Sequence, residues 1–152
     1  MMAEKKVVPL AVPDIGDDEI EEIKKVMGTG FLTEGATTKE FEQMVADYLG
    51  VKHAIAVTSC TTGLHAVLHC LDIKGQEVIV PDYTYPATAE AVVLAGGIPV
   101  LSDVDLDSMN MTTEILEEAY DEKMTVFSPV SWAGVPLEKE MYQKAKKLDL
   151  KM

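Results

Sequence analysis

The stretch HAIAVTSCTTGLHAVLHCLDIKGQEVIV, residues 53–80, decides the predicted fold. It starts with a short apolar run (53–58), continues in a helical pattern (61–71) and enters a second apolar run (77–82) rich in Val and Ile. Strands that alternate with helices in this way are typical of a parallel sheet built with right-handed crossovers. The stretch therefore predicts an α/β fold.

The same alternation continues toward the end of the sequence. Two more apolar runs lie at 98–104 and 125–130, and helical patterns lie at 86–95, 112–120 and 136–148. We therefore expect three layers, α/β/α, around a mostly parallel sheet.

Two helices are expected before this region. The first has an acidic start, two later lysines and an end at Gly28, an order that suits the helix macrodipole. The second starts with Thr37 and Glu40 in the spacing of a capping box and ends at Gly50. A glycine-punctuated loop, GTGFLTEG, joins them.

Composition excludes several classes of function. The chain has 152 residues, 26 acidic and 13 basic, and a formal net charge of −13, which argues against a nucleic-acid partner. No apolar run approaches a membrane span, and the N-terminus does not read as a signal peptide. Cys60 and Cys70 do not form a disulfide framework. We expect a cytoplasmic protein without a membrane partner.

A run of small polar residues, VTSCTTGL (57–64), links the first predicted strand to a predicted helix. The N–H groups of a helix's first turn have no partner within the helix and favour an anion. The hydroxyls of Ser59, Thr61 and Thr62 can add donors to a phosphate. An ordinary N-cap is the alternative interpretation, since Ser and Thr are preferred there, but a cap needs only one of these hydroxyls.

Aromatic and imidazole side chains give weaker signals. Tyr83 and Tyr85 follow a predicted strand, so a ring there can lie on a planar cofactor, or it can simply cover the sheet edge. His65 and His69 have a helical spacing that could bind one metal ion, but no further ligand completes a set, and we expect no metal site. We interpret Trp132 as core or interface material.

The order of these motifs resembles the DegT/StrS-type aminotransferases. The resemblance extends from about Ile15 to the end and includes a glycine loop, the phosphate turn, EVIVPDYTYPAT and GGIPVLSDVD. Members are pyridoxal 5'-phosphate (PLP) enzymes that aminate nucleotide-linked keto-sugars. The resemblance implies the first part of the large domain of a fold-type-I PLP enzyme, with an amino acid such as glutamate as the amino donor.

The resemblance also implies site residues. The family's phosphate turn falls on Ser59, Cys60 and Thr61, with Thr62 beside them, and its ring-stacking aromatic falls on Tyr85. The substrate-side loop falls on residues 28–35, a segment often shared across a dimer interface. Its candidate substrate-binding residues are Gly30, Phe31 and Thr33.

The sequence departs from the family pattern at several points. Cys60 stands where Gly is usual, and Ser131 stands where many members have His. The ring-nitrogen carboxylate and the Schiff-base lysine of the family have no counterpart here, and we therefore predict no catalytic residue. We expect a fragment that stops in mid-unit after residue 152 and is inactive by itself.

The predicted organisation follows from the same resemblance. Residues 1–52 would form an N-terminal helical segment with the substrate-side loop, and residues 53–152 an incomplete PLP-binding α/β large domain. Strands 77–82 and 98–104 would be neighbours, while 53–58 and 125–130 would lack most partners. Unpaired strand edges favour association, so we expect a homodimer or association with a complementary chain.

Two other functions compete with the N-terminal part of an aminotransferase. The chain could be a non-catalytic subunit or truncated relic of that family, which the missing lysine favours. A flavodoxin-like FMN protein is the other alternative, because it too is a small acidic α/β protein. Against it, the phosphate turn should follow the first strand near the N-terminus, whereas about fifty residues precede the turn here.

Overall fold

The computed structural model of the protein describes residues 8, 9 and 11–152. The chain divides into two compact units, one ending at Ala56 and the other beginning at Val57. The functional division expected between residues 52 and 53 stays a prediction.

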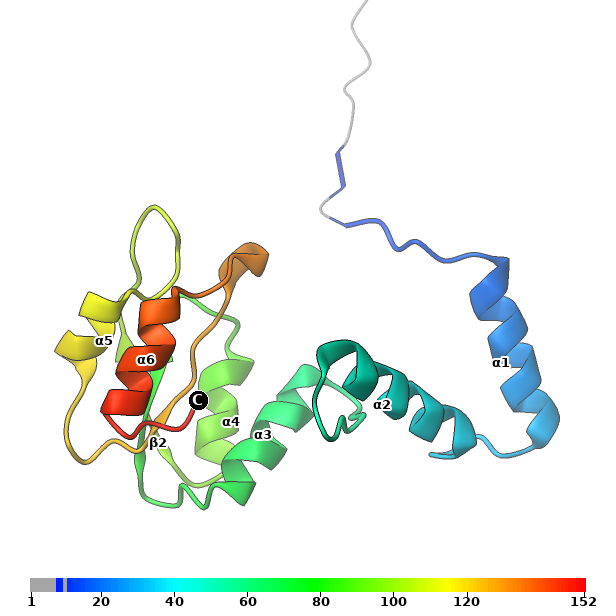
Figure 1. The fold of residues 1–152 in the computed structure, drawn as a ribbon, viewed down its shortest axis with the longest axis horizontal. Helices are drawn as coiled ribbons and strands as arrows, with labels where there is room; N and C mark the ends of the chain where they lie inside the picture. The colour runs from blue at the N-terminus through cyan, green and yellow to red at the C-terminus, as the bar shows by residue number, and fades with distance from the viewer. Residues whose placement is uncertain (1–7, 10) are drawn as a thin grey trace, which may run out of the picture. The chain divides into compact units, whose positions relative to one another are not determined.

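The first unit contains two helices, α1 (Asp17–Thr29) and α2 (Ala36–Leu49) (Figure 1). Helix α1 continues two residues beyond the predicted end, because Gly30, with φ of 70°, provides the left-handed C-cap. Helix α2 ends at Gly50 as predicted, with φ of 65°.

The predicted capping box at Thr37 and Glu40 is wrong. Helix α2 begins two residues earlier than this box requires, with Gly35 in place of Thr37 as its N-cap and no side-chain cap. Instead, the carboxylate of Glu19 accepts a hydrogen bond from the Gly16 backbone N–H at 2.7 Å, at the start of α1. This hydrogen bond is the largest cause of the lowered pKa of Glu19.

The second unit is a three-layer α/β/α arrangement. Its elements are α3 (Cys60–Cys70), β1 (Glu77–Pro81), α4 (Ala87–Leu94), β2 (Ile98–Ser102), α5 (Thr113–Ala119), β3 (Val126–Phe127), a 3₁₀ turn (Trp132–Gly134) and α6 (Lys139–Lys147). The strands are parallel in the order β2-β1-β3, so the predicted neighbours 77–82 and 98–104 are confirmed. Lys151 forms a further parallel bridge to Val126.

Alternate side chains of β1 point to opposite faces of the sheet and form two cores. Ile79 packs with Leu116 of α5, Phe127 of β3 and Met141 of α6. Val78 and Val80 pack on the other face with α3 and α4. Figure 1 shows α5 and α6 on the side opposite to α3 and α4. The predicted layers are therefore confirmed.

The predicted strand at 53–58 does not form a strand in the described structure. Ile55 is 81% exposed and Val57 is 47% exposed, so neither side chain is part of a packed sheet face. The run at 125–130 forms only the two-residue β3, which pairs with β1. A parallel strand requires hydrogen-bonded neighbours, and the resemblance had indicated few partners for both runs.

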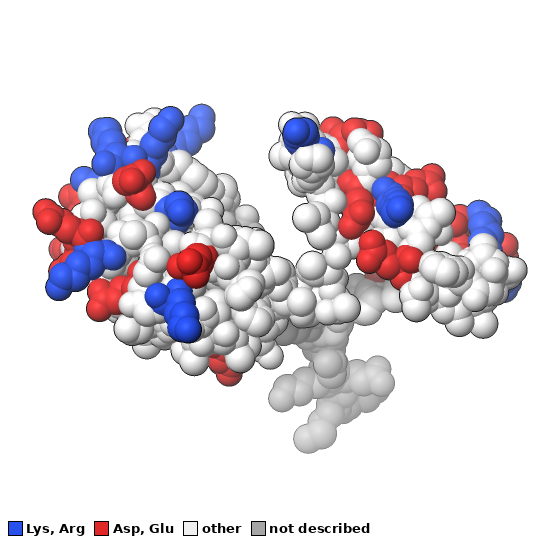
Figure 2. All heavy atoms as spheres, turned by 90° about the horizontal axis from the view of Figure 1, so that it is seen from below, with Lys and Arg blue, Asp and Glu red and all other residues white. Residues whose placement is uncertain are grey.

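Among the described residues, no helix is both long enough and apolar enough to cross a membrane. On the face drawn in Figure 2, acidic and basic side chains are mixed and no basic stripe is present. Cys60 and Cys70 are the first and last residues of α3, and both are free.

Candidate phosphate and cofactor site

The N-terminus of α3 forms a capped turn. Ser59 is the N-cap, with an extended backbone, and its Oγ accepts a hydrogen bond from the Thr62 backbone N–H at 3.1 Å. Thr62 Oγ1 also lies 2.9 Å from Ser59 Oγ and 3.2 Å from Thr58 Oγ1. Ser59 is thus an ordinary N-cap, and the hydroxyls of Thr58 and Thr62 form a small hydrogen-bonded network with it.

The same turn keeps donors that could bind an anion. The backbone N–H groups of Cys60 and Thr61 lie in the first turn, where the helix itself provides no acceptor. Ser59 and Cys60 are exposed, so an anion can approach. The N–H groups of Cys60 and Thr61 are therefore available to an anion while the Ser59 cap stays in place.

Tyr85 lies at the same edge of the sheet as this turn. Helices α3 and α4 pack against each other, and the segments that lead from them into β1 and β2 are joined by a hydrogen bond from Gly75 N–H to Gly96 O at 2.8 Å. Since both helices lead into the starts of parallel strands, both helix N-termini lie at the carboxyl edge. The structure therefore brings Tyr85 and Ser59–Thr62 to one edge.

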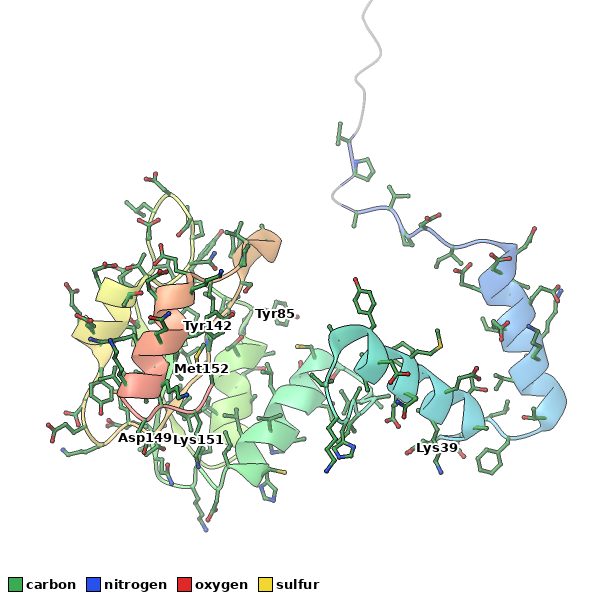
Figure 3. The ribbon with its side chains drawn as sticks, viewed as in Figure 1. Lys39, Tyr85, Tyr142, Asp149, Lys151 and Met152 are labelled. Atoms are coloured by element: carbon green, nitrogen blue, oxygen red, sulfur yellow. The ribbon has the colours of Figure 1, made fainter. Side chains whose placement is uncertain are left out.

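The Tyr85 ring is free to contact a ligand. Its backbone is fixed at the start of α4, where Tyr85 O accepts a hydrogen bond from the Thr88 N–H at 3.0 Å. Thr84 Oγ1 and Thr88 Oγ1 lie 2.9 Å apart beside it. The ring itself is 76% exposed and extends away from the ribbon in Figure 3. This combination gives a fixed base and an open aromatic face.

The predicted substrate-side loop lines a cavity of about 630 Å³ in the first unit. Phe31 and Thr33 are among its lining residues, whereas Gly30 is not. Gly30 instead ends α1 through its N–H bond to Met27 O at 3.1 Å. An added Cβ at Gly35 would lie 3.0 Å from the Phe31 ring, so glycine there permits the close approach of this ring.

Sequence reasoning missed a third group at the carboxyl edge of the sheet. Asn110 follows β2, is 5% exposed and accepts a hydrogen bond from the Trp132 N–H at 2.8 Å. The Trp132 ring lies against Tyr83, with ring centroids 4.6 Å apart. Trp132 is therefore not core material, since it is 38% exposed. Nothing in the sequence around Asn110 indicates this long-range hydrogen bond.

The loop before Asn110 is a tight turn capped by Asp105. The Asp105 carboxylate accepts hydrogen bonds from the backbone N–H groups of Ser108 at 2.8 Å and Asp107 at 3.2 Å. The Ser108 backbone bond is the largest cause of the lowered pKa of Asp105. This turn is closed by a bond from Asp105 N–H to Asn110 O at 2.9 Å.

The histidine pair lies on α3 as the sequence predicts. The rings of His65 and His69 meet edge to face, with centroids 6.3 Å apart. Within the described part of the chain, no group of three or more His, Cys, Asp or Glu residues could hold a metal ion.

The chain is similar in sequence and in fold to known aminotransferases. The sequence profile of the DegT/DnrJ/EryC1/StrS aminotransferase family matches residues 13–151. Spr1654 from Streptococcus pneumoniae is assigned as a sugar aminotransferase and was solved in forms with PLP and with pyridoxamine phosphate (PMP). It is 32% identical to this chain, with a TM-score of 0.84. The match covers 93% of this chain and 35% of Spr1654 in the PMP form.

Two further solved structures are similar. The aminotransferase from Psychrobacter cryohalolentis is 30% identical, with a TM-score of 0.85, over 93% of this chain and 37% of that one. The E. coli GDP-4-keto-6-deoxy-D-mannose-3-dehydratase with bound hydrated PLP is 25% identical, with a TM-score of 0.86, over 93% and 39%. The chain thus spans a little over a third of the length of these proteins.

Proposed function

Because the chain belongs to the DegT/DnrJ/EryC1/StrS aminotransferase family, we propose that it is the N-terminal part of a PLP-dependent enzyme that aminates nucleotide-linked keto-sugars. The amino donor in this proposal is an amino acid such as glutamate. The observation that supports it most is the anion-accepting turn Ser59–Thr62 at the same sheet edge as the open ring of Tyr85. The higher identity to Spr1654 than to the dehydratase favours amination over dehydration.

The proposed roles of the α3 turn and Tyr85 rest on their geometry, and those of Phe31 and Thr33 rest on the resemblance of residues 28–35 to the substrate-side loop of the family. The backbone N–H groups of Cys60 and Thr61 bind the cofactor phosphate, and Ser59 and Thr62 hold the turn in place. Tyr85 contacts the cofactor ring, and Phe31 and Thr33 contact the substrate. When bound, PLP supplies the electron sink that amino-group transfer requires.

We also propose that these 152 residues bind the cofactor without turning over substrate. PLP chemistry requires a lysine amine at the cofactor. The segments that follow the three strands, 82–86, 103–112 and 128–138, contain no lysine. The missing lysine agrees with an N-terminal portion of an aminotransferase that is inactive by itself, and also with a non-catalytic relic of the family. The flavodoxin-like alternative gains no support from the comparisons.

The proposal includes a cytoplasmic location and a homodimer or a complementary partner chain. Two free cysteines are compatible with a reducing compartment. Exposed apolar side chains on α1 and α2, including Ile23, Phe41 and Met44, favour association.

The test is calorimetric titration of the chain with pyridoxamine phosphate, which lacks the aldehyde that would react with surface lysines. Cys60→Pro removes one phosphate donor and keeps the helix, because proline is tolerated at the first helical position. The extended backbone of Ser59, with φ of −162° and ψ of 161°, suits a residue before proline. We expect a loss of affinity of at least about tenfold, as for one hydrogen bond to a charged group.

Two variants serve as controls. Cys60→Gly retains the N–H and should bind at least as tightly as the wild-type chain. Cys70→Ser changes the other end of α3 and should have no effect. Equal affinity for pyridoxamine with and without its phosphate would contradict the phosphate turn, and no binding of either by the wild-type chain would contradict the proposed function.

A further inference from the structure

Asn110 connects two loops at the carboxyl edge of the sheet. It lies in the loop after β2 and accepts the backbone N–H of Trp132, which lies after β3, at 2.8 Å. Asn110 is 5% exposed, so water competes little for this bond. The backbone of Asn110 is held by the Asp105–Ser108 turn, because Asn110 O accepts a hydrogen bond from the Asp105 N–H. A buried, fixed acceptor thus defines where the chain places Trp132.

The backbone that follows Trp132 requires such an anchor. Ala133 has φ of 51°, a conformation that residues with a side chain rarely adopt, and Gly134 has φ of 78°. Strained backbone persists when surrounding contacts determine it. The hydrogen bond from the Trp132 N–H to Asn110 Oδ1 is such a contact at the start of this turn.

This turn places two aromatic rings together. Trp132 and Tyr83 lie with ring centroids 4.6 Å apart and an interplanar angle of 53°. Trp132 is 38% exposed and Tyr83 is 45% exposed, so each ring packs on the other and leaves part of its surface open. Tyr83 comes from the segment after β1 that also contains Tyr85. The two rings form an aromatic wall at the edge where the phosphate turn lies.

The amide nitrogen of Asn110 supports a functional interpretation. Asn110 Nδ2 is buried and has no hydrogen-bond partner among the described residues. An unpaired buried donor is unfavourable for stability, so a purely structural position would not require an amide here. Buried polar groups without a partner are expected mainly at sites that serve function.

We propose that Asn110 is a positioning residue that fixes the aromatic wall of Tyr83 and Trp132, and that this wall receives the sugar ring of the substrate. The C–H bonds on one face of a pyranose form an apolar surface that packs on an aromatic ring. The identity of the ligand rests on the proposed function. The role of Asn110 in placing Trp132 does not.

The positioning role is tested by fluorescence, because Trp132 is the single tryptophan of the chain. In Asn110→Ala we expect a red-shifted emission and a roughly twofold larger acrylamide quenching constant, since the Trp132 turn opens locally. Asn110→Asp keeps an acceptor oxygen and should restore values near the wild type. Tyr83→Leu changes a half-exposed ring and should also raise quenching without unfolding the chain. Unchanged quenching in both Asn110→Ala and Tyr83→Leu would overturn the proposal.

The sugar contact is tested with GDP-mannose as the probe, on chain saturated with pyridoxamine phosphate. In saturation-transfer NMR we expect the mannose ring protons to receive saturation, and Trp132→Leu and Asn110→Ala to reduce it by at least about threefold, as for loss of one aromatic contact. Asn110→Asp should restore the signal. Affinity for pyridoxamine phosphate, measured by calorimetry, should stay within about twofold in all three variants.

The two proposals fail in different ways. If pyridoxamine phosphate does not bind the wild-type chain, the proposed function fails, while Trp132 fluorescence still decides the role of Asn110. If pyridoxamine phosphate binds and the mannose protons receive no saturation, or receive it equally in Trp132→Leu, the aromatic wall does not receive the sugar.

Discussion

Gly97 shows how one residue without a side chain determines local packing. It lies between α4 and β2, where the chain turns into the sheet. A Cβ added there would lie 2.6 Å from Ile73 Cδ1, 3.0 Å from Val92 Cγ1 and 3.3 Å from Gln76 O. Ile73 and Val92 are fully buried, so neither side chain can move aside easily.

We therefore predict that Gly97→Ala destabilises the second unit by about 1–3 kcal/mol through overpacking. Urea unfolding, monitored by circular dichroism at a fixed chain concentration, measures the change in the free energy of unfolding. Gly28→Ala is the matched control, because nothing lies within 4 Å of a Cβ there, and it should stabilise α1 by about 0.5–1 kcal/mol. An unfolding midpoint for Gly97→Ala equal to that of the wild type would show that the contact is relieved without cost.

At the scale of elements, the loop between β2 and α5 depends on one carboxylate. Asp105 accepts hydrogen bonds from Ser108 and Asp107, and the backbone bond from Ser108 lowers its pKa the most. The folded-state pKa lies below the ordinary value of 3.8. The carboxylate therefore stabilises the loop above that pH, and this contribution is lost as the pH falls through the lowered pKa.

We predict that Asp105→Asn lowers the stability of the chain at neutral pH, and that the difference from the wild type shrinks as the pH falls below about 3.8. Thermal unfolding across a pH series measures this difference. Glu118→Gln removes an exposed negative charge outside the loop and is the control for net charge. Carboxyl NMR titration should also show a higher pKa for Asp105 in Ser108→Ala. A difference between Asp105→Asn and the wild type that does not change with pH would contradict the role of the loop.

At the scale of the whole molecule, the distribution of apolar surface is uneven. The second unit has two buried clusters around its sheet. Helices α1 and α2 bury only Ala46 among their described residues. Side chains such as Ile23, Met44 and Tyr48 are more than half exposed. Large exposed apolar surfaces mark sites of association.

We predict that the chain alone forms oligomers, so that its unfolding midpoint depends on the chain concentration. Light scattering after size exclusion should give a mass above the 16.6 kDa of one chain. Met44→Glu should shift the mass toward the monomer, because a charge on the apolar face opposes burial. Gln43→Glu adds the same charge to α2 at an exposed position on the opposite side of the helix from the face of Phe41, Met44 and Tyr48, and should leave the mass unchanged. A monomer with a single cooperative thermal transition would contradict this prediction.

Local sequence patterns predicted most of the fold. The helices at 61–71, 86–95, 112–120 and 136–148 form with ends shifted by one to three residues, since periodicity marks an element better than its ends. The capping box at Thr37 and the strand at 53–58 were wrong. In the first, Gly35 became the N-cap of α2 instead. In the second, a strand depends on neighbours that no local pattern provides.

The candidate site likewise has a part that local sequence predicts and a part that it does not. The turn Ser59–Thr62 and the ring of Tyr85 could be predicted, because each is contained in a short segment whose chemistry is visible in the sequence. The wall of Tyr83 and Trp132, held by Asn110, could not, because its members come from three loops that only the parallel sheet brings to one edge. Local sequence was enough to predict the helices and the chemistry that each loop contains. Which loops meet depends on the order of the strands in the sheet, because the hydrogen bond between Asn110 and Trp132 joins residues 22 positions apart.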